Sequence, residues 1–125
     1  MPQLADLFKA LADTSRLRIM NILSRKCLCV CDLQTVLELR QPFISRHLAT
    51  LRKVGLVGTA RQGRRVCYSL TLGTAFGYAL QSFLRDTLPL SAEFQGDLRR
   101  LVAHESKTPA LVSNNGGRAN LPKAA

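Results

Sequence analysis

The sequence predicts a mainly α-helical domain with a small β-hairpin. Apolar residues recur at intervals of three and four along most of the chain up to Val102, which is the spacing of amphipathic helices. Apolar and polar residues alternate on either side of Gln62-Gly63, which is the pattern of two strands joined by a turn. With 125 residues, of which 46% are hydrophobic, the chain has the length and apolar content of one domain with a modest core.

Three short helices are expected before residue 41. The first runs from Leu4 to about Asp13, and Asp13 or Thr14 can cap the second. The third starts close to Cys31 or Asp32, because aspartate suits a helix N-terminus, and residues 38–40 form the turn after it. The residues that keep helical spacing in the first and third helices are Leu4, Leu7, Phe8, Leu11, Leu33, Val36 and Leu37. Those expected to face inward from the second helix are Leu17, Ile19, Met20 and Leu23.

The fourth helix opens at Pro42, because proline is favoured in the first helical turn, and Gly55 ends it. Its core-facing residues are Ile44, Leu48 and Leu51, which leave Phe43, Ser45, Arg46 and Thr50 nearer the outside. Two short helices joined by a tight turn have the helix-turn-helix form, whose second helix reads the major groove of DNA. Residues 41–52 are therefore the predicted recognition helix.

The hairpin comprises residues 56–61 and 64–70. Val66, Tyr68 and Leu70 share one face, so Cys67 points to the other, and we expect it to be an ordinary strand residue. A basic hairpin that follows a recognition helix is a wing. The predicted fold is therefore a winged helix-turn-helix.

A fifth helix over residues 73–88 carries an apolar stripe that suits either the core or a dimer seam. The expected organisation is a DNA-binding and dimerisation domain at residues 1–90, an extra C-terminal helix at 91–104 and a disordered tail at 105–125. His104 is isolated near the tail, and we expect no role for it.

The charge distribution indicates a polyanionic partner. The chain has 18 Lys and Arg against 8 Asp and Glu, and no acidic residue lies between Glu38 and Asp86. Charge that serves solubility alone is usually mixed in sign, so double-stranded DNA is the favoured partner. The basic residues in this block are Arg40, Arg46, Arg52, Lys53, Arg61, Arg64, Arg65 and Arg85.

A cytoplasmic location is expected. The residues after Met1 lack a cationic start and a long apolar run, so they do not resemble a secretory signal. The longest uncharged run, Val66 to Leu84, contains several Ser, Thr and Gly residues, so we expect no membrane span.

Three cysteines lie at two-residue spacing, Cys27, Cys29 and Cys31, and cannot cross-link distant parts of a fold. They suit a ligand set or a reactive cluster. Residues two apart on a helix point about 200° apart, whereas in an extended segment all three share one face. Joint coordination therefore requires the start of the third helix to be, or become, non-helical. The helix N-terminus and the nearby Arg25 and Lys26 are expected to lower the thiol pKa.

Residues 11–20, 29–33 (Cys-Val-Cys-Asp-Leu), 41–48, 51–56 and 61–64 together resemble the arsenic-repressor (ArsR/SmtB) family of winged-helix metalloregulators. The resemblance covers residues 4–88 and is strongest to the arsenite-sensing branch. It implies a homodimer, joined through the first and last helices, that represses an operon until arsenite or antimonite releases it. The DNA-facing residues that it implies are Gln41, Pro42, Ser45 and Arg46, with the wing residues Arg61, Gln62, Arg64 and Arg65 near the backbone or minor groove.

The chain departs from the family pattern in its donor residues. Some arsenite repressors have a third cysteine where this chain has Gln34, so the third thiolate must be Cys27, Cys67 or an external thiol; the predicted metal site is Cys27, Cys29 and Cys31. No cysteine precedes Cys27, unlike in the cadmium and lead sensors. Residues 73–88 lack the histidines that zinc and nickel sensors use, and thiolates favour softer ions.

Two other functions compete with an arsenite-released repressor. A repressor that senses oxidants or reactive sulfur would use the same cysteines, including Cys67, through disulfide or polysulfide links. A small thiol oxidoreductase is disfavoured, because the chain has no Cys-x-x-Cys motif and no βαβ pattern. The chain is therefore not expected to be an enzyme.

Overall fold

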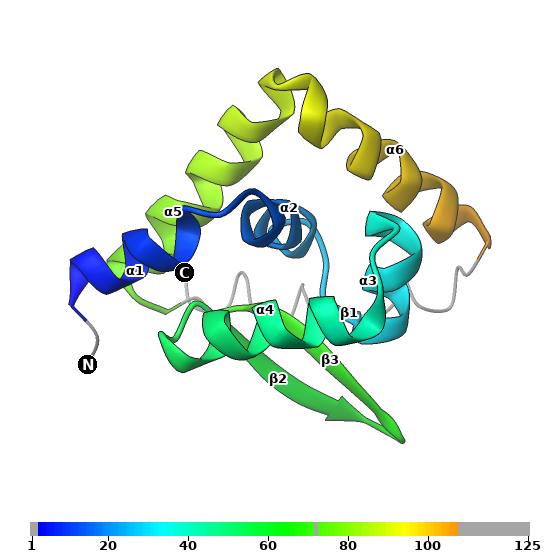
Figure 1. Ribbon diagram of the computed structural model, residues 1–125, viewed down its shortest axis with the longest axis horizontal. Helices are drawn as coiled ribbons and strands as arrows, with labels where there is room; N and C mark the ends of the chain where they lie inside the picture. The colour runs from blue at the N-terminus through cyan, green and yellow to red at the C-terminus, as the bar shows by residue number, and fades with distance from the viewer. Residues whose placement is uncertain (1–2, 72, 108–125) are drawn as a thin grey trace.

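The computed structural model describes residues 3–71 and 73–107 and has the predicted mainly helical architecture with a small antiparallel sheet (Figure 1). The elements in chain order are α1 (Leu4–Leu11), α2 (Thr14–Leu23), β1 (Leu28–Cys29), α3 (Val30–Leu37), α4 (Gln41–Lys53), β2 (Val57–Gln62), β3 (Arg65–Leu70), α5 (Ala75–Thr87), η1 (Leu88–Leu90) and α6 (Ala92–Lys107). Among these helices, none is both long and apolar enough to cross a membrane.

Local side-chain chemistry sets the helix boundaries. Asp13 caps α2 as predicted, with its carboxylate accepting a hydrogen bond from the Arg16 N–H at 3.0 Å. The third helix begins at Val30, slightly earlier than predicted, because Cys29 and Asp32 form a capping box. Glu38 adopts the left-handed conformation (φ 58°) and ends α3, which leaves a tight turn before α4.

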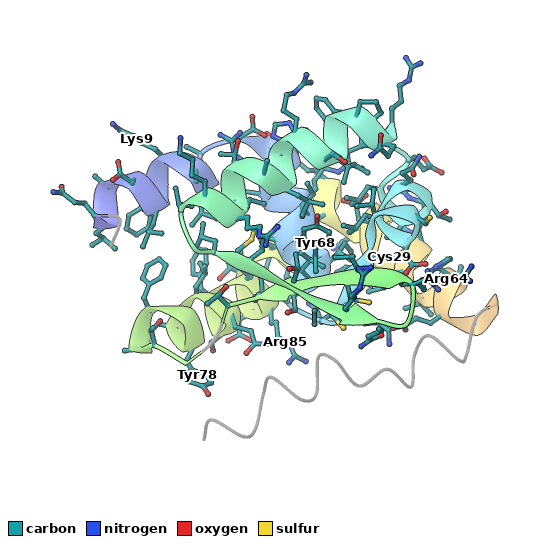
Figure 2. All side chains as sticks on the ribbon, turned by 90° about the horizontal axis from the view of Figure 1, so that it is seen from below. Lys9, Cys29, Arg64, Tyr68, Tyr78 and Arg85 are labelled. Carbon is teal, nitrogen blue, oxygen red and sulfur yellow. The ribbon has the colours of Figure 1, made fainter. Side chains whose placement is uncertain are left out.

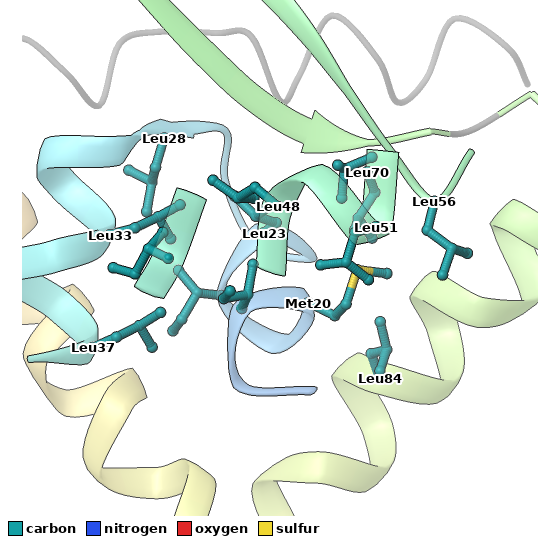
Figure 3. Close-up of a cluster of buried hydrophobic side chains, with 14 of the residues drawn as sticks. Met20, Leu23, Leu28, Leu33, Leu37, Leu48, Leu51, Leu56, Leu70 and Leu84 are labelled. Atoms are coloured by element: carbon teal, nitrogen blue, oxygen red, sulfur yellow. The ribbon is translucent and has the colours of Figure 1, made fainter. Parts of the chain in front are cut away.

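The core forms around α2, whose Ile19, Met20 and Ile22 are fully buried. The predicted inward residues of α4, Ile44, Leu48 and Leu51, pack into this same cluster, in which Figure 3 labels Leu48 and Leu51. Burying one such side chain stabilises the fold by about 1.5–3 kcal/mol relative to an exposed one. The helix-turn-helix is therefore held by its apolar face, and the polar face of α4 stays outside.

The sheet has the strand order β1-β3-β2. Gln62 pairs with Arg65, so the loop between β2 and β3 is residues 63–64, one position later than the predicted Gln62-Gly63 turn. Gly63 has φ 65°, which glycine adopts without steric cost. The two-residue strand β1 was not predicted, and it ties the segment before α3 to the wing: Leu28 pairs with Tyr68, and Cys29 with Cys67.

The C-terminal helix α6 packs on α2 and α3. Its Asp97, which is fully buried, accepts hydrogen bonds from Arg18 Nε and Nη2, both at 2.8 Å. Arg18 also donates to the Leu37 carbonyl, and Arg100 to the Val36 carbonyl, so α6 and α2 together satisfy the C-terminal end of α3. Residues 105–107, expected in a disordered tail, belong to α6, and the rest of that tail lies outside the described residues.

Candidate thiol site and nucleic-acid interface

The start of α3 divides the three clustered cysteines. Cys27 and Cys29 are buried beside and within β1, whereas Cys31 is on the first turn of α3 and is exposed. The structure therefore does not bring the predicted set of Cys27, Cys29 and Cys31 together. Within the described residues, no three or more His, Cys, Asp or Glu side chains lie close enough together to hold a metal ion without rearrangement.

Cys29, which Figure 2 labels, is the centre of a partly buried polar network. Its thiol donates to Asp32 Oδ2 at 3.0 Å and accepts from Arg65 Nη2 at 2.7 Å. Arg65 Nη2 is also 3.4 Å from Asp32 Oδ2. On the other side, His104 Nε2 is 2.8 Å from Asp32 Oδ1. One carboxylate thus connects the thiol, the wing and α6.

His104 was expected to have no role, and that expectation is wrong. Its imidazole is 14% exposed and lies against Asp32, 72 positions earlier in the chain. No local pattern could have indicated the pair, because it depends on how α6 packs on α3. Of the two nearby cations, Lys26 pairs with Glu105 at 3.5 Å, and Arg25 donates to the Arg85 carbonyl.

Burial raises the pKa of the Cys29 thiol, and its hydrogen bond to Asp32 raises it further, while the bond from Arg65 opposes the shift. The predicted lowering of the thiol pKa is therefore wrong for Cys29, because burial outweighs the helix N-terminus. Burial and the neighbouring Cys27 and Cys29 raise the pKa of Cys67 to about 11. Burial alone would raise the pKa of Asp32, but hydrogen bonds from Cys29 and His104 hold it below its usual value.

Cys67 is not an isolated strand residue. It is buried on β3 directly across from Cys29, and its thiol is 3.4 Å from Gln62 Oε1. Sequence reasoning missed this pairing because a two-residue strand has no periodicity to detect.

The predicted DNA-facing residues of α4 form one polar surface at its N-terminal end. Gln41, Pro42 and Arg46 are exposed, and Ser45 is half-buried. Gln41 Nε2 donates to Ser45 Oγ at 2.8 Å, and the Arg46 guanidinium lies 5.7 Å from the centre of the Phe43 ring. These contacts hold the side chains in place, and no acidic side chain of the described chain forms a salt bridge with them.

The wing residues divide into two groups. Arg61, Gln62 and Arg64 are exposed around the hairpin loop. Arg65, in contrast, turns back to Cys29 and Asp32, although 45% of its side chain remains exposed. Of the four residues predicted to face DNA from the wing, Arg65 contacts Cys29 and Gln62 contacts Cys67. Both residues therefore connect the cysteines to the wing, whereas Arg61 and Arg64 are exposed at the hairpin.

A helix-turn-helix followed by a basic hairpin defines a winged-helix regulator, and comparison with known proteins agrees. Residues 13–59 match the model of the arsR family of bacterial regulatory proteins, and the chain belongs to that family. It is 54% identical over 66 residues to the arsenical resistance operon repressor of Escherichia coli strain K12, covering 52% of this chain and 56% of the relative. It is 50% identical over 64 residues to ArsR1 of Pseudomonas putida, covering 50% of each chain.

The chain thus spans about half the length of the curated relatives it matches. Among solved structures, the transcriptional regulator HlyU from Vibrio vulnificus has a TM-score of 0.60 and 34% identity, covering 67% of this chain and 85% of that one. The cadmium sensor CMTR from Mycobacterium tuberculosis has a TM-score of 0.58 and 34% identity, covering 69% and 84%. These relatives are named as regulators and not as enzymes.

Proposed function

We propose that this chain is a transcriptional repressor that binds double-stranded operator DNA as a homodimer in the cytoplasm. We further propose that trivalent arsenic or antimony, bound by cysteine thiols of residues 27–31, releases it. The observation that carries the proposal is the position of Cys29, which caps the first helix of the helix-turn-helix and accepts a hydrogen bond from the wing. The names of the relatives in Escherichia coli and Pseudomonas putida support an arsenical inducer.

For DNA, the proposed reading surface is the exposed N-terminal end of α4, with Gln41, Pro42, Ser45 and Arg46 toward the major groove. Arginine at such a position can bind guanine through two hydrogen bonds. Arg61, Gln62 and Arg64 at the hairpin loop would contact the phosphate backbone or the minor groove, which adds affinity without reading sequence. Arg65 donates to Cys29, so only the part of its guanidinium that this contact leaves exposed could bind DNA.

The homodimer is supported by apolar side chains that the fold leaves exposed on α1 and α5. Leu4 is 57% exposed, Phe8 55% and Phe83 54%. Phe8 also meets Phe76 of α5 edge to face, so the first helix and this later helix lie together. Exposed apolar side chains do not stabilise a monomer, whereas a symmetric partner would remove them from water.

The protonation state of the thiols favours a metalloid over a divalent cation. Arsenous acid condenses with three neutral thiols, and its three hydroxyl groups leave as three waters with the thiol protons. A divalent cation instead requires thiolates, so its binding releases protons. The raised pKa of Cys29 therefore penalises a divalent cation more than it penalises arsenous acid.

The release step follows from the same contacts. A Cys29 sulfur that binds arsenic no longer donates to Asp32, and its hydrogen bond from Arg65 is disturbed. If Cys31 also binds, the first turn of α3 must unwind, because Cys29 and Cys31 point to opposite sides of that helical start. Either change alters the position of α3 or of the wing relative to α4, and so the fit to DNA.

The experiment is a titration of operator binding with arsenite, under anaerobic conditions and with a phosphine reductant. The operator duplex carries a fluorophore, and binding is read by anisotropy. We expect the affinity for DNA to fall by about 5–150-fold, the usual range of allosteric coupling. Unchanged affinity at saturating arsenite contradicts the proposal.

The second candidate is a repressor released by oxidants or reactive sulfur, and the cross-strand pair of Cys29 and Cys67 favours it. Hydrogen peroxide would oxidise the two thiols to one disulfide with formation of two waters. The same anisotropy titration, with peroxide in place of arsenite and without reductant, tests it. Release by peroxide but not by arsenite supports this candidate over the first.

A further inference from the structure

The face of the sheet that carries Cys29 also carries Cys67. The two residues are direct partners in the antiparallel β1–β3 register, and both are buried. Side chains of directly opposed residues stand on the same face, with Cβ atoms about 4.5–5.5 Å apart. Arg65 lies two positions before Cys67 on the same face of β3, and its contact with the Cys29 sulfur confirms the common face.

Cys27 lies on the same side. It directly precedes β1 and lies two positions before Cys29, the spacing at which side chains of an extended chain point the same way. It is buried, and it is close enough to Cys67 to contribute to the raised pKa of that thiol. Cys31 differs on each count, because it is exposed and follows the start of α3.

We propose that Cys67 on β3 completes the metalloid site, so that the three sulfur ligands are Cys27, Cys29 and Cys67. The proposal rests on the arsenite-released repressor proposed above and replaces Cys31 in the ligand set that the sequence predicts. A metal–thiolate bond is about 2.3 Å long, so two sulfurs on one ion lie within about 4.6 Å. Opposed Cβ atoms about 4.5–5.5 Å apart can reach that separation by side-chain rotation.

Rotation of the Cys29 and Cys67 side chains breaks hydrogen bonds and changes the contacts of the wing. The Cys29 sulfur must turn from Asp32 and Arg65, and the Cys67 sulfur must leave Gln62. Both Arg65 and Gln62 belong to the hairpin, so filling the site changes the contacts of the wing directly. In this arrangement α3 keeps its first turn, and the changed position of the wing weakens the contact with DNA.

The ligand set can be counted. The full-length wild type, Cys31→Ser and Cys67→Ser proteins are each loaded with one equivalent of sodium arsenite. A phosphine reductant keeps buffer thiols from acting as ligands. X-ray absorption gives the number of sulfurs around arsenic, and near-ultraviolet absorbance gives the affinity. Operator binding without arsenite and thermal unfolding serve as controls for folding, and Cys67→Ala is the second variant at this buried position.

We expect three sulfurs in the wild type and in Cys31→Ser, with equal affinities. Cys67→Ser and Cys67→Ala should retain two sulfurs and bind arsenite at least 10-fold more weakly, because even the loss of a supporting group around a metal site costs about 10–100-fold. Three sulfurs in both Cys67 variants, or the loss of one in Cys31→Ser, overturns this ligand set and leaves the repressor proposal intact. A wild type that binds arsenite through three sulfurs but is not released from DNA contradicts the repressor proposal alone.

Discussion

Replacing Cys29 by serine separates sensing from DNA binding, because Cys29 belongs to both candidate ligand sets and lies outside the proposed DNA surface. A serine hydroxyl can still donate to Asp32 and accept from Arg65, so the network around the start of α3 is retained. Serine is also a favoured N-cap residue, and Cys29 is the N-cap of α3. We therefore expect the free energy of unfolding to change by no more than about 1 kcal/mol.

The effect on release is expected to be large. Coupling between two ligands of about 1–3 kcal/mol corresponds to the 5–150-fold loss of operator affinity expected for the wild type with arsenite. Removing the central sulfur leaves two thiols, so Cys29→Ser should lose less than about twofold, a coupling of roughly 0.4 kcal/mol or less. Without arsenite, its operator affinity should remain within a few-fold of wild type.

The assay is anisotropy with a labelled operator duplex, with and without saturating arsenite, for wild type and Cys29→Ser in parallel. Cys31→Ser is measured in parallel, because it removes an exposed thiol whose sulfur makes no hydrogen bond among the described contacts. It should keep release if the ligands are Cys27, Cys29 and Cys67, and lose release if Cys31 is a ligand. Full inducibility of Cys29→Ser would refute the sensor assignment. Loss of operator binding before arsenite is added would instead mean that the thiol itself holds the DNA-binding conformation.

Three further predictions concern DNA, stability and pH. Arg46→Ala should weaken operator binding by about 1–3 kcal/mol and leave binding to random DNA nearly unchanged. Arg64→Ala should weaken binding to operator and random DNA alike, and reduce by about one the slope of log affinity against log salt concentration. Equal losses for Arg46→Ala on the two DNAs would reassign Arg46 to a phosphate contact. Asp97→Asn breaks a buried ion pair and should lower the free energy of unfolding by about 3–5 kcal/mol in urea titrations, while the exposed control Asp86→Asn should change it by less than about 0.5 kcal/mol. The raised pKa of Cys67, about 11, keeps this thiol protonated at neutral pH, so binding of a divalent cation must release its proton. Cadmium affinity, measured by competition with a chelator, should therefore increase between pH 6 and 8 by up to about tenfold per pH unit for each proton released, while arsenite affinity should stay nearly constant. Parallel pH dependences for cadmium and arsenite would contradict this reasoning.

The helices and the wing could be predicted because their signals are local. Asp13 is a capping residue wherever a helix follows it, and the spacing of Ile44, Leu48 and Leu51 defines one face of a helix without knowledge of any partner. The basic block between Glu38 and Asp86 is likewise visible in the chain itself. The residues proposed to face DNA could therefore be named from the sequence, and the structure exposes most of them at the N-terminal end of α4 and on the hairpin.

The thiol half depended on contacts that no local pattern encodes. Strand β1 has two residues, too few for a period to appear, so its pairing with β3 and the placement of Cys67 opposite Cys29 follow only from tertiary packing. The contact between Asp32 and His104 depends in the same way on the packing of α6 against α3.

The direction of the Cys29 pKa shift shows why the properties of the thiols could not be predicted from local sequence. The sequence places a helix N-terminus and two cations beside this thiol, and both would lower its pKa. Burial has the opposite effect, and burial is a property of the folded chain as a whole. The sequence by itself determined the helices and the wing, and it indicated candidate residues for a soft ion and for DNA. Only the tertiary structure decided which thiols lie together and how strongly they hold their protons.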